Sequence, residues 1–268
     1  MYSAKLVFGK APKRVTAKTE LLVDLFLADL SQAGQIGPIT SFCRSDGELT
    51  AFIDVSRPDS LEIENYSKYG GERLDQIRKE FGQAPALTIL DDDVPSRFPS
   101  LKSASFLVLS GDFWRNDHPV RRGRDGYGLP AYLLQLDQID PSICHNLHVW
   151  KRRYEAYFDV WFHTATLEMP AYREIAEPKS ALSREARDYC KDIEQSTGIP
   201  TYYHLYRYYG KRGDEKSRRC PLCGDKWLLE KPYINKQRDW EIYYLCEKCR
   251  ITSDRSRNFD EPRLCRYW

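Results

Sequence analysis

The first 140 residues alternate between short apolar runs of β-type composition and stretches with a helical pattern. Helices are predicted at 19–33 and 72–81, each followed by a glycine, which is the usual residue just past a helix end. The expected strands cover residues 1–9, 39–44, 49–55, 86–90 and 105–109, the last two of them buried. With a hairpin turn at 45–47, this order indicates an α+β domain over residues 1–140.

From Pro141 onward the apolar positions change to a helical period. Large apolar residues recur at steps of three and four up to about residue 163, which predicts one long helix with a core stripe: Leu147, Trp150, Tyr154, Tyr157, Phe158 and Trp161. Shorter helices are expected at 168–177 and 180–196. Residues 141–200 are therefore predicted to form a helical unit that packs on the first domain.

Two Cys-x-x-Cys pairs lie in the last quarter of the chain, Cys220/Cys223 and Cys246/Cys249, with 22 residues between them. This spacing is typical of a zinc ribbon, in which a hairpin brings two tight turns together around one Zn²⁺ ion. We expect the zinc to be structural, because four sulfur ligands complete a tetrahedral shell and leave no position for water or substrate. Two disulfides or four free thiols are the alternative, and they would need two identical spacings to arise by accident.

The expected third part, residues 201–268, begins with an aromatic strand and a basic hinge and ends with the zinc ribbon. Residues 201–212 hold five tyrosines, and as a strand they would place Tyr202, His204, Tyr206 and Tyr208 on one side. Rings interleaved with cations can stack bases and hold phosphates, but packing of one strand face between the ribbon and the helical unit is favoured. The candidate nucleic-acid or partner-binding residues come from this strand, the hinge at 211–219 and the hairpin tip: Tyr206, Arg207, Tyr208, Lys211, Arg212, Arg218, Arg219, Lys231, Lys236 and Arg238.

Charge is distributed unevenly along the chain, although 41 Lys/Arg against 39 Asp/Glu give a net charge of only +2. From residue 201 on there are 16 basic and 10 acidic residues, a balance of +6, so the remaining 25 basic and 29 acidic residues carry −4. Zn²⁺ with four thiolates would lower the balance of the C-terminal part to about +4. This asymmetry favours a nucleic acid or an acidic protein as partner, but it falls far short of a strongly basic DNA-binding domain.

The remaining candidate motifs do not indicate catalysis. Three arginines beside glycines in 112–126 could hold a phosphate, but a solvated loop with arginine–aspartate pairs is favoured. His145 and His148 lack the glutamate and third ligand of a catalytic metal site, and the three aspartates at 91–93 are favoured as a turn. We therefore expect a protein that is not an enzyme. Without a signal-peptide core or an apolar run of membrane length, a cytoplasmic location is expected.

Three stretches of the C-terminal part resemble a bacterial family of unknown function: residues 200–210 (PTYYHLYRYYG), 219–227 (RCPLCGDKW) and 246–250 (CEKCR). The helix around Trp150 and residues 180–187 are similar as well. That family is described as zinc-ribbon-containing, and nucleic-acid binding has been suggested for it. For this chain the resemblance implies zinc ligation by the four cysteines at 220, 223, 246 and 249.

These observations lead to two hypotheses about function. In the first, a non-catalytic zinc-ribbon protein binds nucleic acid through its basic, tyrosine-rich C-terminal region, and the lack of a recognition-helix pattern favours a single strand over a duplex. In the second, the chain is a protein-binding adaptor or inhibitor, such as an immunity protein that neutralises a bacterial toxin. Tyrosine, tryptophan and arginine concentrate at protein interfaces, which is consistent with the second hypothesis.

Overall fold

The computed structural model describes residues 1–10, 16–38, 42–45, 47–91, 98, 100–111, 118–213, 215–261 and 264. The expected fold class is confirmed: a mixed α/β N-terminal region, helices in the middle and a four-cysteine cluster near the C-terminus. Tertiary contacts divide the chain into two compact units, Met1–Phe98 with Pro130–His145, and Pro99–Leu129 with Asn146–Trp268. The first unit ends at His145, five residues after the expected boundary at 140, but it leaves out residues 99–129. Residue 200 is not a boundary, because strands from both sides of it share one sheet.

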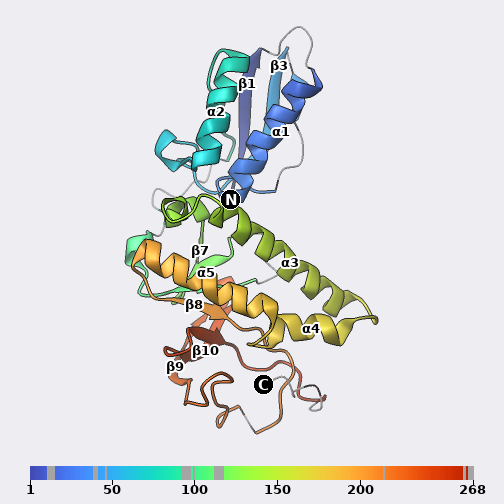
Figure 1. The fold of residues 1–268 in the computed structure, drawn as a ribbon, viewed down its shortest axis with the longest axis vertical. Helices are drawn as coiled ribbons and strands as arrows, with labels where there is room; N and C mark the ends of the chain where they lie inside the picture. The colour runs from blue at the N-terminus through green and yellow to red at the C-terminus, as the bar shows by residue number, and fades with distance from the viewer. Residues whose placement is uncertain are drawn as a thin grey trace. The chain divides into compact units, whose positions relative to one another are not determined.

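The first unit is a four-stranded antiparallel sheet with two helices (Figure 1). Its elements alternate along the chain as β1 (Tyr2–Lys10), α1 (Ala17–Gln32), β2 (Phe42–Ser45), β3 (Glu48–Val55), α2 (Lys68–Phe81) and β4 (Ala86–Ile89). The spatial order β2-β3-β1-β4 places the two longest strands in the centre. This is the β-α-β-β-α-β arrangement known as ferredoxin-like.

Alternation of side chains along β1 explains how this sheet buries one face. Ala4, Leu6 and Phe8 are buried in the core with α1 and α2, whereas the residues between them are more exposed. Strand β4 lies at the edge of the sheet, and its residues are exposed or half-buried, so the prediction that this strand is buried is wrong. Both helices begin at a hydroxyl cap, and α2 starts one turn earlier than predicted because Ser67 accepts a hydrogen bond from the Gly70 N–H.

The second unit is built on a seven-stranded mixed sheet with the order β7-β6-β5-β8-β11-β10-β9. Its strands are β5 (Leu107–Leu109), β6 (Val120–Arg122), β7 (Gly128–Leu129), β8 (Thr201–His204), β9 (Leu228–Asn235), β10 (Trp240–Cys246) and β11 (Ile251–Ser253). The central strand β8 pairs in parallel with β5 on one side and with β11 on the other. The ribbon strands β9–β11 therefore continue the sheet of residues 99–129, and the ribbon is not a separate arm.

Three helices complete the second half of the chain: α3 (Ile143–His163), α4 (Glu168–Ala176) and α5 (Ala181–Thr197). The predicted stripe of α3 is buried except for Tyr157, which is 37% exposed. Trp150 lies at the centre of this packing, because its Nε1 donates to the Leu182 carbonyl at 3.1 Å and its ring contacts Tyr203 of β8. Among the helices of the described residues, none is both long and apolar enough to cross a lipid bilayer. Short 3₁₀ helices occur at Ile63–Asn65, Leu101–Ser103, Ala131–Leu134, Leu136–Gln138 and Lys236–Arg238.

Two predicted segments differ from the structure. The aromatic strand ends at His204 instead of continuing to residue 212, and all four residues of β8 are buried, because the strand lies in the middle of a sheet rather than on a one-sided surface. In the predicted charged loop, Arg121 belongs to β6, is 2% exposed and donates to the Gly126 carbonyl. The expected arginine–aspartate pairing does occur between Arg122 and Asp125 at 2.8 Å. Residues 92–97 and 112–117, with Asp46 of the predicted hairpin turn, lie outside the described residues.

Candidate metal centre

The first Cys-x-x-Cys pair lies on a tight turn defined by backbone hydrogen bonds. The Gly224 N–H donates to the Cys220 carbonyl and the Cys220 N–H donates to the Asp225 carbonyl, each at 2.9 Å. Gly224 has φ +76°, a left-handed conformation that glycine adopts without a steric penalty. Burial by itself raises the pKa of the Cys220 thiol, but hydrogen bonds from the backbone of Cys223 and Leu222 and from neighbouring cysteines leave that pKa below its ordinary value.

The second pair, Cys246 and Cys249, forms a turn of the same kind with an arginine where the first turn has a glycine. Arg250 has φ +53°, which costs a residue with a side chain about 1–2 kcal/mol. The contacts of the side chain explain why an arginine occurs here in place of glycine. The guanidinium donates to the Tyr202 hydroxyl at 3.0 Å and to the Glu194 carboxylate at 2.7 Å. Arg250 therefore ties the second turn to β8 and α5.

The two turns bring the four sulfur atoms together. The Sγ atoms of Cys220, Cys223, Cys246 and Cys249 all lie within 4.8 Å of one another, and those of Cys223 and Cys246 are 3.6 Å apart. Zn–S bonds of about 2.3 Å give a tetrahedron with S–S edges of about 3.8 Å, whereas a disulfide bond is about 2.05 Å long. The spacing thus fits a shared metal ion and does not fit disulfide pairing, and these cysteines are free.

Two of these thiols have raised pKa values. Burial raises the pKa of Cys246 to about 11 and raises the pKa of Cys249 as well, and hydrogen bonding to neighbouring cysteine sulfurs adds to both shifts. Metal ligation requires each cysteine to be a thiolate, and a bound cation stabilises that charged form. An all-sulfur donor set is one of those that structural zinc sites use.

A buried charged cluster connects the approach segment, residues 205–219, to the ribbon. The guanidinium of Arg218 lies over the rings of Trp227 and Tyr244, at 4.8 and 4.4 Å from their centroids. Glu215 lies 3.6 Å from Arg207 and 3.9 Å from Arg218, and its carboxylate accepts hydrogen bonds from Tyr244 and Ser256 at 2.9 Å. The side chains of both arginines are only 6% exposed.

The pKa values of this cluster follow from burial and pairing. Burial by itself raises the pKa of Glu215, but Arg207 and the hydrogen bonds from Tyr244 and Ser256 overcome this effect and hold the pKa below its ordinary value. Burial lowers the pKa of Arg218 to about 9, so this side chain is still a cation at neutral pH. Arg207 was expected on the aromatic strand and Arg218 in the basic hinge, both as candidate binding residues. The structure instead buries both side chains in the packing around Glu215.

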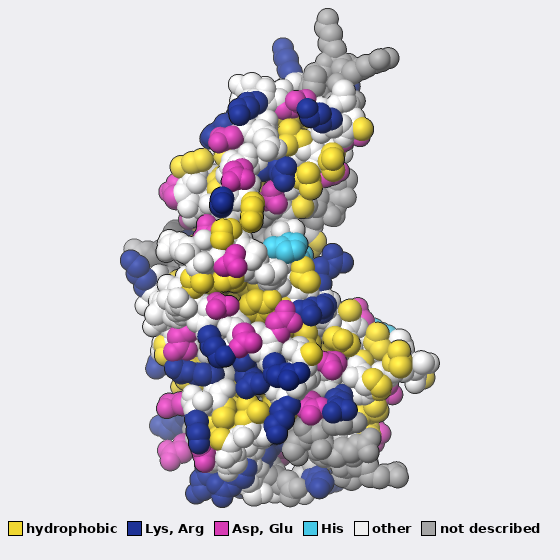
Figure 2. Space-filling view, viewed as in Figure 1, with side chains coloured by type: hydrophobic (Ala, Val, Ile, Leu, Met, Phe, Trp, Pro, Cys, Tyr) yellow, Lys and Arg dark blue, Asp and Glu magenta, His cyan; other side chains and the backbone are white. Residues whose placement is uncertain are grey.

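Six other predicted residues do lie at the surface: Lys211, Arg212, Arg219, Lys231, Lys236 and Arg238. Arg212 pairs with Asp260 at 3.0 Å, and the guanidinium of Arg238 lies over the ring of Tyr127 at 4.7 Å. Figure 2 shows Lys and Arg side chains gathered over α5 and the ribbon. Tyr206 and Tyr208 are half-buried, with ring centroids 5.4 and 5.1 Å from that of Trp161, so their rings pack largely against α3.

Two residues that organise the site were not singled out from the sequence. Glu215 and Arg250 act through contacts with residues far along the chain, and pattern analysis does not detect such contacts. Arg250 had one available signal, since it occupies the position that glycine fills after the first cysteine pair.

Comparison with known proteins places the chain in a family. Residues 101–206 match a domain of unknown function, DUF2310, and residues 210–259, which contain both cysteine pairs, match a second domain of unknown function, DUF8594. An uncharacterized protein of Haemophilus influenzae is 32% identical over 158 residues, which are 59% of this chain and 74% of the relative. The chain belongs to the same family as this protein.

A second uncharacterized protein of the same organism is also 32% identical over 158 residues, but there the match covers only 58% of the relative. No solved structure matches the chain. The resemblance seen in the sequence is thus supported as far as a family of unknown function and a four-cysteine cluster, and the relatives carry no description of a ligand.

Proposed function

We propose that the four cysteines hold one structural zinc ion and that the chain is a non-catalytic binding protein. The observation that supports a structural ion is the all-sulfur donor set with separations close to tetrahedral edges. Four thiolates leave no coordination position for water or substrate, so the ion stabilises the two turns rather than taking part in a reaction. A reducing compartment such as the cytoplasm would keep these thiols available to the metal.

Metal content of the purified full chain tests the first part of the proposal. The wild type should retain one zinc ion per chain, and Cys223→Ser should lose it, because ion binding in such modules is worth about 10–16 kcal/mol and depends on all four ligands. Cys43→Ser is the matched control, since Cys43 is exposed on β2, outside the cluster. Retention of one zinc ion by Cys223→Ser would contradict the proposal.

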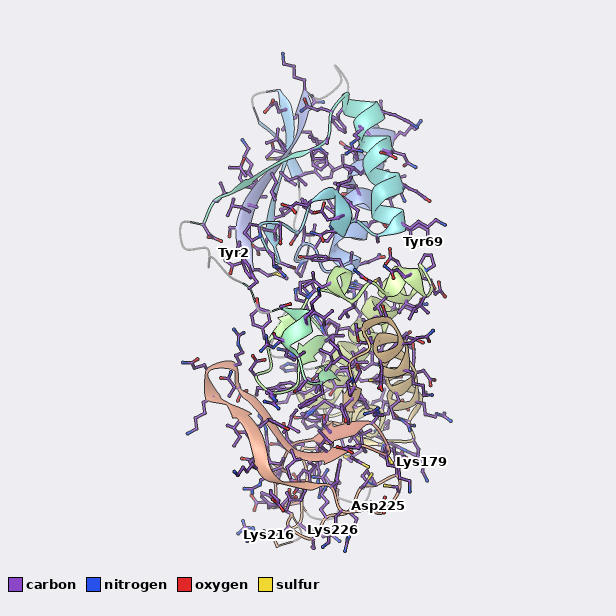
Figure 3. All side chains as sticks on the ribbon, turned by 90° about the vertical axis from the view of Figure 1, so that its left-hand side faces the viewer. Tyr2, Tyr69, Lys179, Lys216, Asp225 and Lys226 are labelled. Carbon is purple, nitrogen blue, oxygen red and sulfur yellow. The ribbon has the colours of Figure 1, made fainter. Side chains whose placement is uncertain are left out.

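We further propose that the ribbon binds single-stranded nucleic acid through its exposed cations. At the hairpin, Lys231 and Lys236 form no ion pair with a described carboxylate, and Arg238 contacts an aromatic ring instead of an acid. Figure 3 shows two more lysines at the surface nearby, Lys216 of the approach segment and Lys226 of the ribbon. Exposed cations without acidic partners, beside the half-buried Tyr127 ring that Arg238 covers, are suited to phosphates and stacked bases.

Salt-dependent binding of matched RNA and DNA strands, single and duplex, tests this second part. The triple substitution Lys231→Gln, Lys236→Gln and Arg238→Gln should make the slope of log affinity against log salt less negative by about 2, because each lost single-strand phosphate contact reduces its magnitude by about 0.7. The control replaces three exposed lysines of the first unit, Lys18, Lys68 and Lys79, by glutamine. An unchanged slope in the hairpin variant, or no binding at low salt, would refute nucleic-acid binding through the hairpin.

One observation favours a protein partner as the second candidate function. Tyr157, Phe162 and Leu167, around the end of α3 and the start of α4, are 37%, 48% and 66% exposed, and Figure 2 shows apolar side chains gathered there. Exposed aromatic groups are typical anchors of protein interfaces. If the chain is an adaptor or inhibitor, Phe162→Asp should abolish co-purification of the partner and leave strand affinity unchanged.

A further inference from the structure

A groove of about 620 Å³ lies between α5 and both cysteine turns, within the second unit. One wall is the face of α5 that carries residues three and four positions apart, from Arg184 to Glu194. The other wall consists of Leu222 and Cys223 from the first turn and residues 248–250 from the second. A volume of this size is within the range of small-molecule binding sites.

Cations dominate the lining of this groove. Five basic residues line it, Arg184, Arg187, Lys191, Lys248 and Arg250, against two acidic residues, Asp188 and Glu194. Both carboxylates are already paired, Asp188 with Lys191 at 2.6 Å and Glu194 with Arg250 at 2.7 Å. Lys248 lies 3.7 Å from Asp225, and both side chains of this pair are exposed. Arg184 and Arg187 form no ion pair with any carboxylate of the described residues, so positive charge remains uncompensated at these two arginines.

Arg187 is held in place by uncharged groups. Its guanidinium donates to the carbonyl oxygens of Pro178 at 3.3 Å and Ser183 at 3.4 Å, and its side chain is half-buried. These carbonyls fix the orientation of the guanidinium but supply no negative charge. A partly desolvated cation that is oriented but not neutralised is stabilised by an anion that enters the groove.

We propose that this groove binds a phosphate group, contacted by Arg184, Arg187 and Lys248. Arginine presents a planar fork that matches two phosphate oxygens, and lysine adds a point charge. Lys248 lies between two cysteine ligands of the second turn, so the cluster positions one wall of the phosphate site. The ligand is a phosphate ester or the terminal phosphate of a strand, and the site stands whether or not the hairpin binds nucleic acid.

A competing explanation is that these cations neutralise the two excess negative charges of a Zn²⁺–tetrathiolate centre. The two explanations differ in what a loss of the cations would change. Under the competing explanation, the loss of Arg184 and Lys248 weakens zinc retention, and added phosphate has no site. Under the phosphate proposal, zinc retention is unchanged and phosphate binding is lost.

Calorimetric titration of the zinc-loaded full chain with pyrophosphate tests the proposal. Pyrophosphate should bind, and both Arg184→Gln/Lys248→Gln and Arg184→Gln/Arg187→Gln should weaken binding by at least about tenfold, as expected for the loss of charge-assisted hydrogen bonds. The first pair is exposed, so its replacement preserves the fold even if Arg187→Gln does not. The control, Lys68→Gln/Lys79→Gln on α2, should change the affinity by less than about twofold.

Two matched oligonucleotides, with a 5′-phosphate and with a 5′-hydroxyl, distinguish the sources of the phosphate. Tighter binding of the phosphorylated strand, lost in the groove variants, identifies a strand end as the ligand. Pyrophosphate binding without this preference identifies a free phosphate ester. No heat with pyrophosphate, or equal affinity in wild type and Arg184→Gln/Lys248→Gln, would overturn the proposal. Strand binding that depends only on the hairpin lysines, with no pyrophosphate binding, would leave the hairpin function standing without the groove.

Discussion

Glu215→Gln offers the sharpest test of how the ribbon is attached to the rest of the second unit. This substitution removes one negative charge and keeps the size of the side chain and part of its hydrogen bonding to Tyr244 and Ser256. What it leaves behind is a pair of guanidinium groups, Arg207 and Arg218, that are 6% exposed and repel each other. We therefore expect a large loss of stability from a change of only a few atoms.

The size of the expected destabilisation follows from the distances of Glu215 to Arg207 and to Arg218. At 3.6 and 3.9 Å, and with an effective dielectric constant of about 20, each attraction to Glu215 amounts to roughly 4 kcal/mol. Glutamine dipoles and solvent relaxation recover part of this loss. Removal of one partner from a buried ion pair usually costs about 3–5 kcal/mol, and we expect the free energy of unfolding to fall by that amount.

Urea unfolding of the zinc-loaded protein at neutral pH measures this change. All six tryptophans lie in the residue ranges of the second unit, so tryptophan fluorescence reports on the unit that contains Glu215. Asp260→Asn is the control, because the Arg212–Asp260 pair has a distance of 3.0 Å but is 79% and 83% exposed. The control should cost less than about 1 kcal/mol.

The pH dependence of the folding stability gives an independent check, because the direction of the change is defined. The folded-state pKa of Glu215 lies below its ordinary value of 4.5, so the stabilisation by its charge is complete above about 4.5 and is lost as the pH falls through the folded pKa. Glutamine does not titrate, and the stability difference between wild type and Glu215→Gln should narrow below pH 4.5. If the variant is as stable as the Asp260→Asn control at neutral pH, the buried arginines do not depend on Glu215 and the reasoning fails.

Two further predictions concern backbone positions and use the same urea assay. Arg250→Ala should be less stable than Arg250→Gly by about 1 kcal/mol. Both variants lose the contact with Glu194, but only glycine adopts the left-handed conformation without strain. Equal stability of the two variants would mean that φ +53° carries no strain. Gly123→Ala should lower the free energy of unfolding by more than about 2 kcal/mol, because the added Cβ would overlap the Phe106 ring. At Gly224 an added Cβ meets no atom within 4 Å, so Gly224→Ala should cost only about 1 kcal/mol through backbone strain. A reversed order of these two variants would show that close packing around Gly123 is not limiting.

Local patterns in the sequence were sufficient to predict most helices and the four-cysteine cluster. Helix α5 lies within one residue of its predicted range, because its signals, the Ser180 cap and Gly198 at the C-terminal end, act within one turn of the helix. The cysteine spacing likewise predicted a shared site, since two Cys-x-x-Cys turns bring their sulfurs together once a hairpin connects them.

The surroundings of the cluster depended on contacts that local patterns do not contain. Strand β8 pairs with β5, about ninety positions earlier in the chain, and with β11, about fifty positions later, so its burial on both faces is a property of the sheet and not of the tyrosine run. The local sequence does not distinguish Arg207 and Arg218 from the exposed arginines at 212 and 219. Arg207 and Arg218 are buried only because of their contacts with Glu215, Trp227 and Tyr244. The sequence by itself determined the helices and the metal ligands through short-range geometry, whereas the tertiary structure decided which cations remain at the surface, because burial depends on residues distant in the chain.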